Sequence, residues 1–125
     1  MRTIFPFLLL SLLLLTLLWS CSGKTKAEAN QEEAEVRGAQ LLDQARKALR
    51  AEDYEQARRL VMSLRTECPL ALEARRRAIL TLDSIELASS TDSVRYAEGE
   101  EWERLSMKQQ FYQRKLKEDI HSYGD

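Results

Sequence analysis

Apolar side chains recur every three or four residues through most of the chain after residue 35, and this period is the strongest constraint on its fold. Such spacing places the apolar side chains on one face of an α-helix. Glycine and proline, which interrupt helices, occur only four and two times in 125 residues. Ala, Leu, Glu, Arg, Lys and Gln dominate after residue 25, a composition typical of long helices. The sequence therefore predicts an all-α fold.

Two helices are predicted to form an antiparallel pair. The first covers about residues 35–50, and its apolar stripe consists of Val36, Ala39, Leu42, Ala45 and Leu49. Asp53 is placed to accept hydrogen bonds from the free amides that open the second helix. The second helix must end near Cys68, because Pro69 disfavours helical geometry in the residue before it. A turn as short as residues 51–53 makes the two helices antiparallel.

A third helix is predicted to start at Pro69 or Leu70 and to run through Ile85, which gives a three-helix bundle over residues 35–90. The polar run at residues 89–92 favours an interruption, although a continuous helix is also compatible with it. Residues 91–125 then form a long C-terminal helix. A coiled-coil-like seam lies along it, made of Trp102, Leu105, Gln109, Tyr112 and Leu116. Such a seam packs on another helix, of the same bundle or of a second chain, so a homo-oligomer through this helix stays open.

The segment from Gly38 to Pro69 resembles a tetratricopeptide repeat. The positions that match are Leu41, Ala45, Asp53, Tyr54, Ala57, Val61 and Pro69, while Gln44, Ala48, Glu52 and Leu64 replace the usual Leu, Tyr, Gly and Ala. The resemblance implies an antiparallel helical hairpin that binds a protein or peptide in a groove. We expect Leu41, Ala45, Tyr54, Ala57 and Val61 to form the packing seam. Because about three such repeats are normally needed to bury a continuous core, the third helix is expected to cover the hairpin.

The first residues carry a leader with a short basic start and an apolar run from Ile4 to Trp19. These sixteen residues would rise about 24 Å as a helix, less than the roughly 30 Å of a bilayer core. A permanent transmembrane helix is therefore the weaker reading, and residues 1–20 are predicted to be a signal peptide.

The leader ends in Leu18, Trp19, Ser20 and Cys21, which resembles the bacterial lipobox. In that family the thiol carries a diacylglyceryl group, a peptidase cuts before the cysteine, and the new amino group is usually acylated with a fatty acid such as palmitate. The resemblance implies that Cys21 is the lipid attachment site and the mature N-terminus. Trp19 departs from the pattern, because a smaller residue normally precedes the small residue before the cysteine. Two or more acyl chains give stable membrane attachment.

Residues 21–34 are predicted to be the lipidated cysteine and a flexible tether, because they are polar and contain no large apolar side chain. The expected location is the bacterial cell envelope, with the outer membrane favoured over the inner and the body outside the cytoplasm.

The sequence contains no constellation that indicates catalysis. It has one histidine, His121, in a C-terminal stretch expected to fray, and two cysteines, Cys21 and Cys68. Neither a zinc site nor a Cys-His nucleophile can be built from these, and no glycine-rich phosphate loop is present. The carboxylates alternate with Lys and Arg, as is typical of solvated helix faces. We expect no enzyme activity, no metal and no cofactor. Cys68 is expected to be a half-buried apolar residue, with an interchain disulfide as the alternative.

Charge gives no sign of a nucleic-acid partner, since 19 basic residues balance 20 acidic ones. The densest basic cluster is Arg75–Arg77. It is interpreted as the solvent-exposed face of a helix, paired with Glu73, or else as a site for lipid headgroups or an acidic partner. The expected function is a membrane-tethered protein-protein interaction module that binds an unknown envelope protein. The alternatives are a self-associating structural lipoprotein and a small envelope enzyme.

Overall fold

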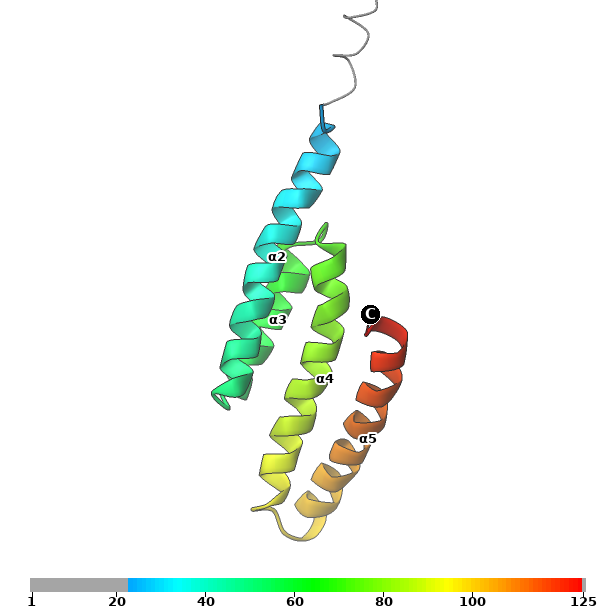
Figure 1. The fold of residues 1–125 in the computed structure, drawn as a ribbon. Helices are drawn as coiled ribbons and strands as arrows, with labels where there is room; N and C mark the ends of the chain where they lie inside the picture. Colours follow the sequence, from blue (N-terminus) through cyan, green and yellow to red (C-terminus); the bar gives the residue numbers. More distant parts are fainter. Residues whose placement is uncertain (1–22, 125) are drawn as a thin grey trace, which may run out of the picture.

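The computed structural model describes residues 23–124, and these form four helices without a strand (Figure 1). The helices are α2 (Lys26–Arg50), α3 (Tyr54–Glu67), α4 (Leu72–Val94) and α5 (Gly99–Tyr123). The all-α class predicted from composition is confirmed. Cys21 and the leader lie outside the described residues.

Helix α4 is the centre of this arrangement. It packs against α2 and α3 on one side and against α5 on the other, while α5 contacts no described helix except α4 (Figure 1). The core is built mostly from small side chains, which lets the helix backbones approach closely. Its buried members are Leu42, Ala45, Ala57, Val61, Leu64, Cys68, Ala71, Ala74, Ala78 and Ile85. Of the expected packing seam, Ala45, Ala57 and Val61 are fully buried, and Leu41 and Tyr54 are partly buried against the same core.

Helix α2 begins at Lys26, so residues 26–34 are helical rather than the flexible tether predicted from their polarity. The start is fixed by a capping box: the Thr25 hydroxyl accepts from the Glu28 N–H (3.3 Å), and the Glu28 carboxylate accepts from the Thr25 N–H (2.9 Å). Residues 23–33 are nonetheless exposed. The predicted flexible conformation is wrong, because a polar sequence rich in Ala, Glu and Lys forms a helix once it is capped. Only Ala34, at the end of the predicted tether, packs against the core.

The turn between α2 and α3 contains Glu52 with φ of 60°, in the left-handed region that favours glycine. The Asp53 side chain accepts from the Gln56 N–H at 3.0 Å, as predicted for a cap. This turn brings α3 back along α2 (Figure 1).

The start of α4 is capped by a side chain from another helix. Glu35 of α2 accepts from the backbone N–H groups of Glu73 (2.8 Å) and Ala74 (3.1 Å). Close by, Gly38 faces α4 so tightly that an added Cβ would lie 2.8 Å from the Ala71 Cβ. These contacts fix where α4 begins along α2.

Helix α4 continues through residues 89–92, where an interruption was favoured. The hydroxyls there are satisfied within the helix: Ser90 donates to the Glu86 carbonyl and Thr91 to the Leu87 carbonyl, each at 2.7 Å. Such bonds remove the competition for backbone groups that would otherwise break a helix. The chain turns instead at residues 95–98, just before Gly99, whose φ is 59°.

Candidate functional site

A groove of about 550 Å³ runs along α4 between α3 and α5. Helices α3 and α5 flank α4 but do not contact each other, which leaves a face of α4 open between them. The residues that line the groove are Val61, Arg65, Leu72, Arg75, Arg76, Ala78, Ile79, Leu82, Asp83, Tyr112, Lys115 and Tyr123. Its floor is apolar.

The groove is basic although the chain as a whole is nearly neutral. Its lining includes four basic side chains, Arg65, Arg75, Arg76 and Lys115, and a single carboxylate, Asp83. Asp83 is neutralised in place, because the Lys115 ammonium lies 2.9 Å from both of its oxygens. The groove therefore presents uncompensated positive charge beside an apolar surface.

The predicted basic cluster at residues 75–77 is divided by the fold. Arg75 and Arg76 line the groove, whereas Arg77 lies on the other side of α4, in a shallower furrow against α2. Arg77 is paired with Glu73 at 3.0 Å, as predicted. Arg76 also reaches Glu73 through Nη2 (3.2 Å), but its Nε is buried without a hydrogen-bond partner among the described residues. A buried donor in this state is costly to leave unpaired.

Ion pairs and hydrogen bonds link the wall formed by α5 to α4. Asp83 is buried, and burial raises its pKa even though the Lys115 hydrogen bond acts in the opposite direction. Lys115 also contacts Asp119 at 2.5 Å, and this hydrogen bond lowers the pKa of Asp119. Leu105 is the only buried residue of α5, at 9% exposure.

A second buried carboxylate joins three helices. Glu86 of α4 is paired with Arg58 of α3, and Lys108 of α5 lies 2.6 Å away. Burial by itself would raise the pKa of Glu86, but the hydrogen bonds from Arg58 and Lys108 outweigh it, so the pKa is lowered. Tyr54 of α3 similarly donates to Asp92 of α4, a bond that raises the Tyr54 pKa to about 12.

The expectation that the carboxylates decorate solvated faces is wrong for Asp83 and Glu86, which are only 2% and 8% exposed. Both alternate with apolar residues in α4, which is surrounded by helices on more than one side. Their basic partners on α5 follow the helical period, with Lys108 and Lys115 seven residues apart on one face. This seven-residue spacing of the two lysines is the one signal in the sequence that indicated partners for Asp83 and Glu86.

The coiled-coil-like seam of the C-terminal helix faces the bundle of its own chain for most of its length. Leu105 is buried, Gln109 donates to Thr91 of α4 (3.1 Å), and Tyr112 lines the groove. Trp102 remains 49% exposed. Three other large apolar side chains of α5 are exposed to a similar or greater degree: Met107, Phe111 and Ile120.

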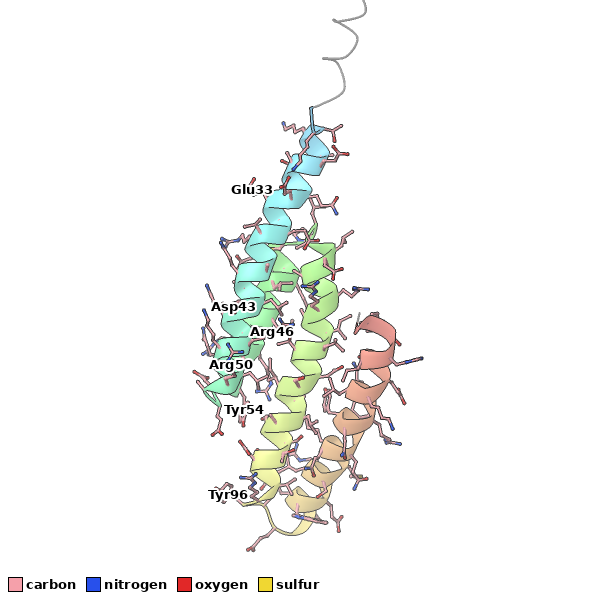
Figure 2. All side chains as sticks on the ribbon, viewed as in Figure 1. Glu33, Asp43, Arg46, Arg50, Tyr54 and Tyr96 are labelled. Atoms are coloured by element: carbon pink, nitrogen blue, oxygen red, sulfur yellow. The ribbon has the colours of Figure 1, made fainter. Side chains whose placement is uncertain are left out.

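Figure 2 shows Tyr96 at the α4–α5 turn, away from the α2–α3 pair.

The other residues singled out from the sequence do not come together in a site. Cys68 is buried at 2% exposure, deeper than the half-buried position expected, and His121 is exposed near the end of α5. Residues 23–124 contain no cluster of three or more His, Cys, Asp or Glu side chains suited to a metal ion. Over the same residues, no helix is both long and apolar enough to cross a membrane.

Comparison of the chain with protein-family models, with curated proteins and with solved structures gave no match.

Proposed function

We propose that this chain is a bacterial envelope lipoprotein whose helical body is a membrane-tethered protein-interaction module without catalytic activity. The observation that carries the proposal is the pairing of two features: a leader that ends in a lipobox-like Leu18–Cys21, and an open apolar groove between α3 and α5. Lipid on Cys21 would hold the body at a membrane, with the outer membrane favoured. The groove offers the surface on which a partner docks.

Two details of the body support an interaction role. The floor of the groove is apolar and reachable, since Leu72 at its edge is 61% exposed. The titratable groups beside it, Asp83, Lys115 and Asp119, are bonded to one another and hold α5 in place, which is a structural use of their charge. The likeness of residues 38–69 to a tetratricopeptide repeat is consistent with this role, and the small residues Gly38, Ala45 and Ala57 support it.

The anchor is tested by metabolic labelling with a fatty-acid analogue in the native host. We expect label on the wild-type chain and none on Cys21→Ala, together with a mass that corresponds to cleavage before residue 21. An unlabelled chain that keeps its methionine start would contradict the lipoprotein assignment.

The interaction role is tested by placing a photoreactive amino acid at Leu72 in the full chain and irradiating the host membranes. The matched control is the same amino acid at Asp43, an exposed position on α2 remote from the groove. We expect a crosslinked protein from position 72 and none from position 43. Equal crosslinking from the two positions, or none from position 72, would contradict a docking role for the groove.

Self-association through α5 is a second candidate. It is favoured by the exposure of Trp102, Met107, Phe111 and Ile120, which range from 49% to 65% exposed on this helix. Sedimentation velocity of the full chain in neutral detergent separates the two candidates: a dimer that Trp102→Ser dissociates supports self-association, and a monomer at micromolar concentration argues against it.

A further inference from the structure

We infer that the groove between α3 and α5 receives an acidic amphipathic helix of the partner protein. This inference rests on the proposed function and adds the chemistry of the ligand to it. It follows from the shape of the groove, from its charge and from its distance from the anchored end of the chain.

The shape of the groove fits a helix. Its floor follows α4 from Leu72 to Asp83, about 16 Å at 1.5 Å per residue, which is the length of three helical turns. Its walls are helices α3 and α5, which stand apart without touching. A fourth helix laid between them would complete a bundle around the open face of α4, which is the helix-in-groove mode of recognition.

The charge of the groove selects an acidic helix. Arg65 and Arg75 at the edge have no carboxylate within ion-pair distance among the described residues. Within residues 23–124, the Arg75 guanidinium donates a hydrogen bond only to the Pro69 carbonyl, at 3.0 Å. Carboxylates on the ligand would give Arg65 and Arg75 the ion-pair partners that the described residues do not supply.

The apolar floor of the groove requires that the ligand helix also has an apolar face. Leu72 is exposed in the groove and Ile79 and Leu82 are half-buried there, and these three side chains would be covered by large apolar side chains spaced three and four residues apart on the ligand. A ligand that carries charge alone would leave this surface in water. The ligand therefore combines a carboxylate-rich side with an apolar stripe.

The position of the groove favours a protein over anionic lipid headgroups, which share the negative charge. Helix α2 extends past the start of α4 from Lys26 to Ala34, about 12 Å, toward the end of the chain that carries Cys21. Figure 2 shows Glu33 on this extension, beyond the other helices. The groove is thus set back from the end that the proposed anchor would hold at the membrane.

The test uses the full chain in neutral detergent and a helix-stabilised peptide of twelve residues, built from a Leu stripe and Glu at the remaining positions. Two control peptides carry Gln or Lys in place of Glu. By fluorescence anisotropy at low salt, we expect the Glu peptide to bind about tenfold more tightly than the Gln peptide, and to weaken as salt is raised. The Lys peptide should bind more weakly than either. Equal binding of all three peptides, or no binding of the Glu peptide, would overturn the inference.

Variants of the chain locate the binding site. Arg65→Gln and Arg75→Gln should each weaken binding of the Glu peptide by about fivefold, corresponding to the loss of one charge-assisted contact. Arg59→Gln is the matched control, because Arg59 is an equally exposed arginine of α3 that does not line the groove. Unchanged helical circular dichroism verifies that each variant is folded. An effect of Arg59→Gln as large as that of Arg65→Gln would mean that the peptide binds by general charge, against the inference.

Two further measurements address other occupants. If vesicles containing phosphatidylglycerol bind the chain through Arg65 and Arg75 while the Glu peptide does not, the ligand is a headgroup and the inference is wrong. It is equally wrong if the chain dimerises in sedimentation and Arg75→Gln dissociates the dimer. Photocrosslinking from Leu72 distinguishes failure of this inference from failure of the proposed function. A crosslinked protein together with no binding of the Glu peptide would overturn the ligand chemistry and leave the interaction role standing.

Discussion

Gly38 sets the separation of α2 and α4, and at this position the absence of a side chain matters more than helix propensity. A Cβ there would lie 2.8 Å from the Ala71 Cβ and 2.9 Å from the Ala74 Cβ. Neither neighbour has a flexible end that can move aside, so one helix must shift.

Gly38→Ala is expected to destabilise the chain by about 1–2 kcal/mol, because overpacking costs more than the roughly 1 kcal/mol that alanine gains in helix propensity. Thermal unfolding followed by circular dichroism measures the change. Gln40→Ala, an exposed change in the same helix, is the control and should be nearly neutral. A gain in stability from Gly38→Ala would show that α2 and α4 are not held as closely as described.

Glu52 is strained in the turn between α2 and α3, since its φ is 60°. Left-handed backbone costs a residue with a Cβ about 1–2 kcal/mol, and glycine loses about 0.5–1 kcal/mol of chain entropy when it folds. Glu52→Gly is therefore expected to stabilise the chain by about 0.5–1 kcal/mol in denaturant unfolding. Ala51→Gly is the matched control and should destabilise, because Ala51 has φ of −85°. The same sign for both variants would contradict the argument.

At the scale of the elements, α5 differs from the other helices in how it is held. Helices α2, α3 and α4 share a buried apolar core, whereas α5 contributes one buried residue, Leu105, and two charged pairs with α4. The pKa shifts of Asp83 and Glu86 have opposite directions, so folding affects the ionised forms of the two carboxylates in opposite ways. The ionised form of Glu86 is favoured by folding, and that of Asp83 is disfavoured.

Glu86→Gln is expected to lower the free energy of unfolding at pH 7 by about 1–3 kcal/mol, the range for hydrogen bonds to charged groups. The reason is that Arg58 and Lys108 both lose their shared carboxylate. Asp83→Asn should leave stability unchanged or raise it slightly, because an amide avoids the cost of a buried charge and Lys115 keeps Asp119. Denaturant unfolding of the two variants side by side checks this contrast. Equal losses would contradict it.

The same shifts predict the pH dependence. The pKa of Glu86 is lowered from its ordinary 4.5, so its contribution to stability is present above pH 4.5 and is lost as the pH falls through the lower folded value. Asp83 behaves oppositely: its folded pKa is raised from 3.8, so its contribution is complete below pH 3.8 and is lost as the pH rises through the folded value. The stability difference between wild type and Glu86→Gln should therefore become smaller as the pH falls below 4.5, measured by unfolding between pH 3 and pH 7. A constant difference over this range would rule out the ion pairs as its source.

At the scale of the whole molecule, the described chain is a bundle with a helical extension. The first turns of α2 project beyond the other helices and are exposed (Figure 1). If Cys21 is anchored as proposed, only residues 22–25 separate the lipid from this helix. The body would then be held at a more fixed height than a flexible tether allows, which limits the partners that it can reach.

Thr25→Ala is expected to fray this extension without unfolding the body, since the capping box stabilises it locally by about 0.5–2 kcal/mol. Hydrogen exchange of the amides in residues 26–33 should become faster, while the melting temperature of the bundle stays the same. Thr66→Ala, which removes a threonine from the last turn of α3 rather than from an N-cap, should leave exchange in residues 26–33 unchanged. A large drop in melting temperature for Thr25→Ala would show that the extension is part of the cooperative fold.

Local signals in the sequence were enough to predict the helical class and the central helix boundaries. The period of the apolar residues, the Asp53 cap and the constraint imposed by Pro69 are local effects, and α2 ends and α3 spans where they predict. Where local signals conflicted, the prediction was less accurate: the hydroxyls of residues 89–92 were as able to bond within a helix as to break one, and helix α4 continues through them.

The burial of particular polar side chains and the position of the groove depend on how the helices pack, and no local pattern predicts them. Glu35 caps α4 from another helix, and Asp83 and Glu86 meet Lys115 and Lys108 of α5 across the bundle. These pairs join residues about 20 to 40 positions apart, and their energy depends on burial. A sequence period shows which face of a helix is apolar but not how many neighbours surround that helix. The open face of α4 exists because α3 and α5 flank it without meeting, a property of the packing of three helices and of none of them alone.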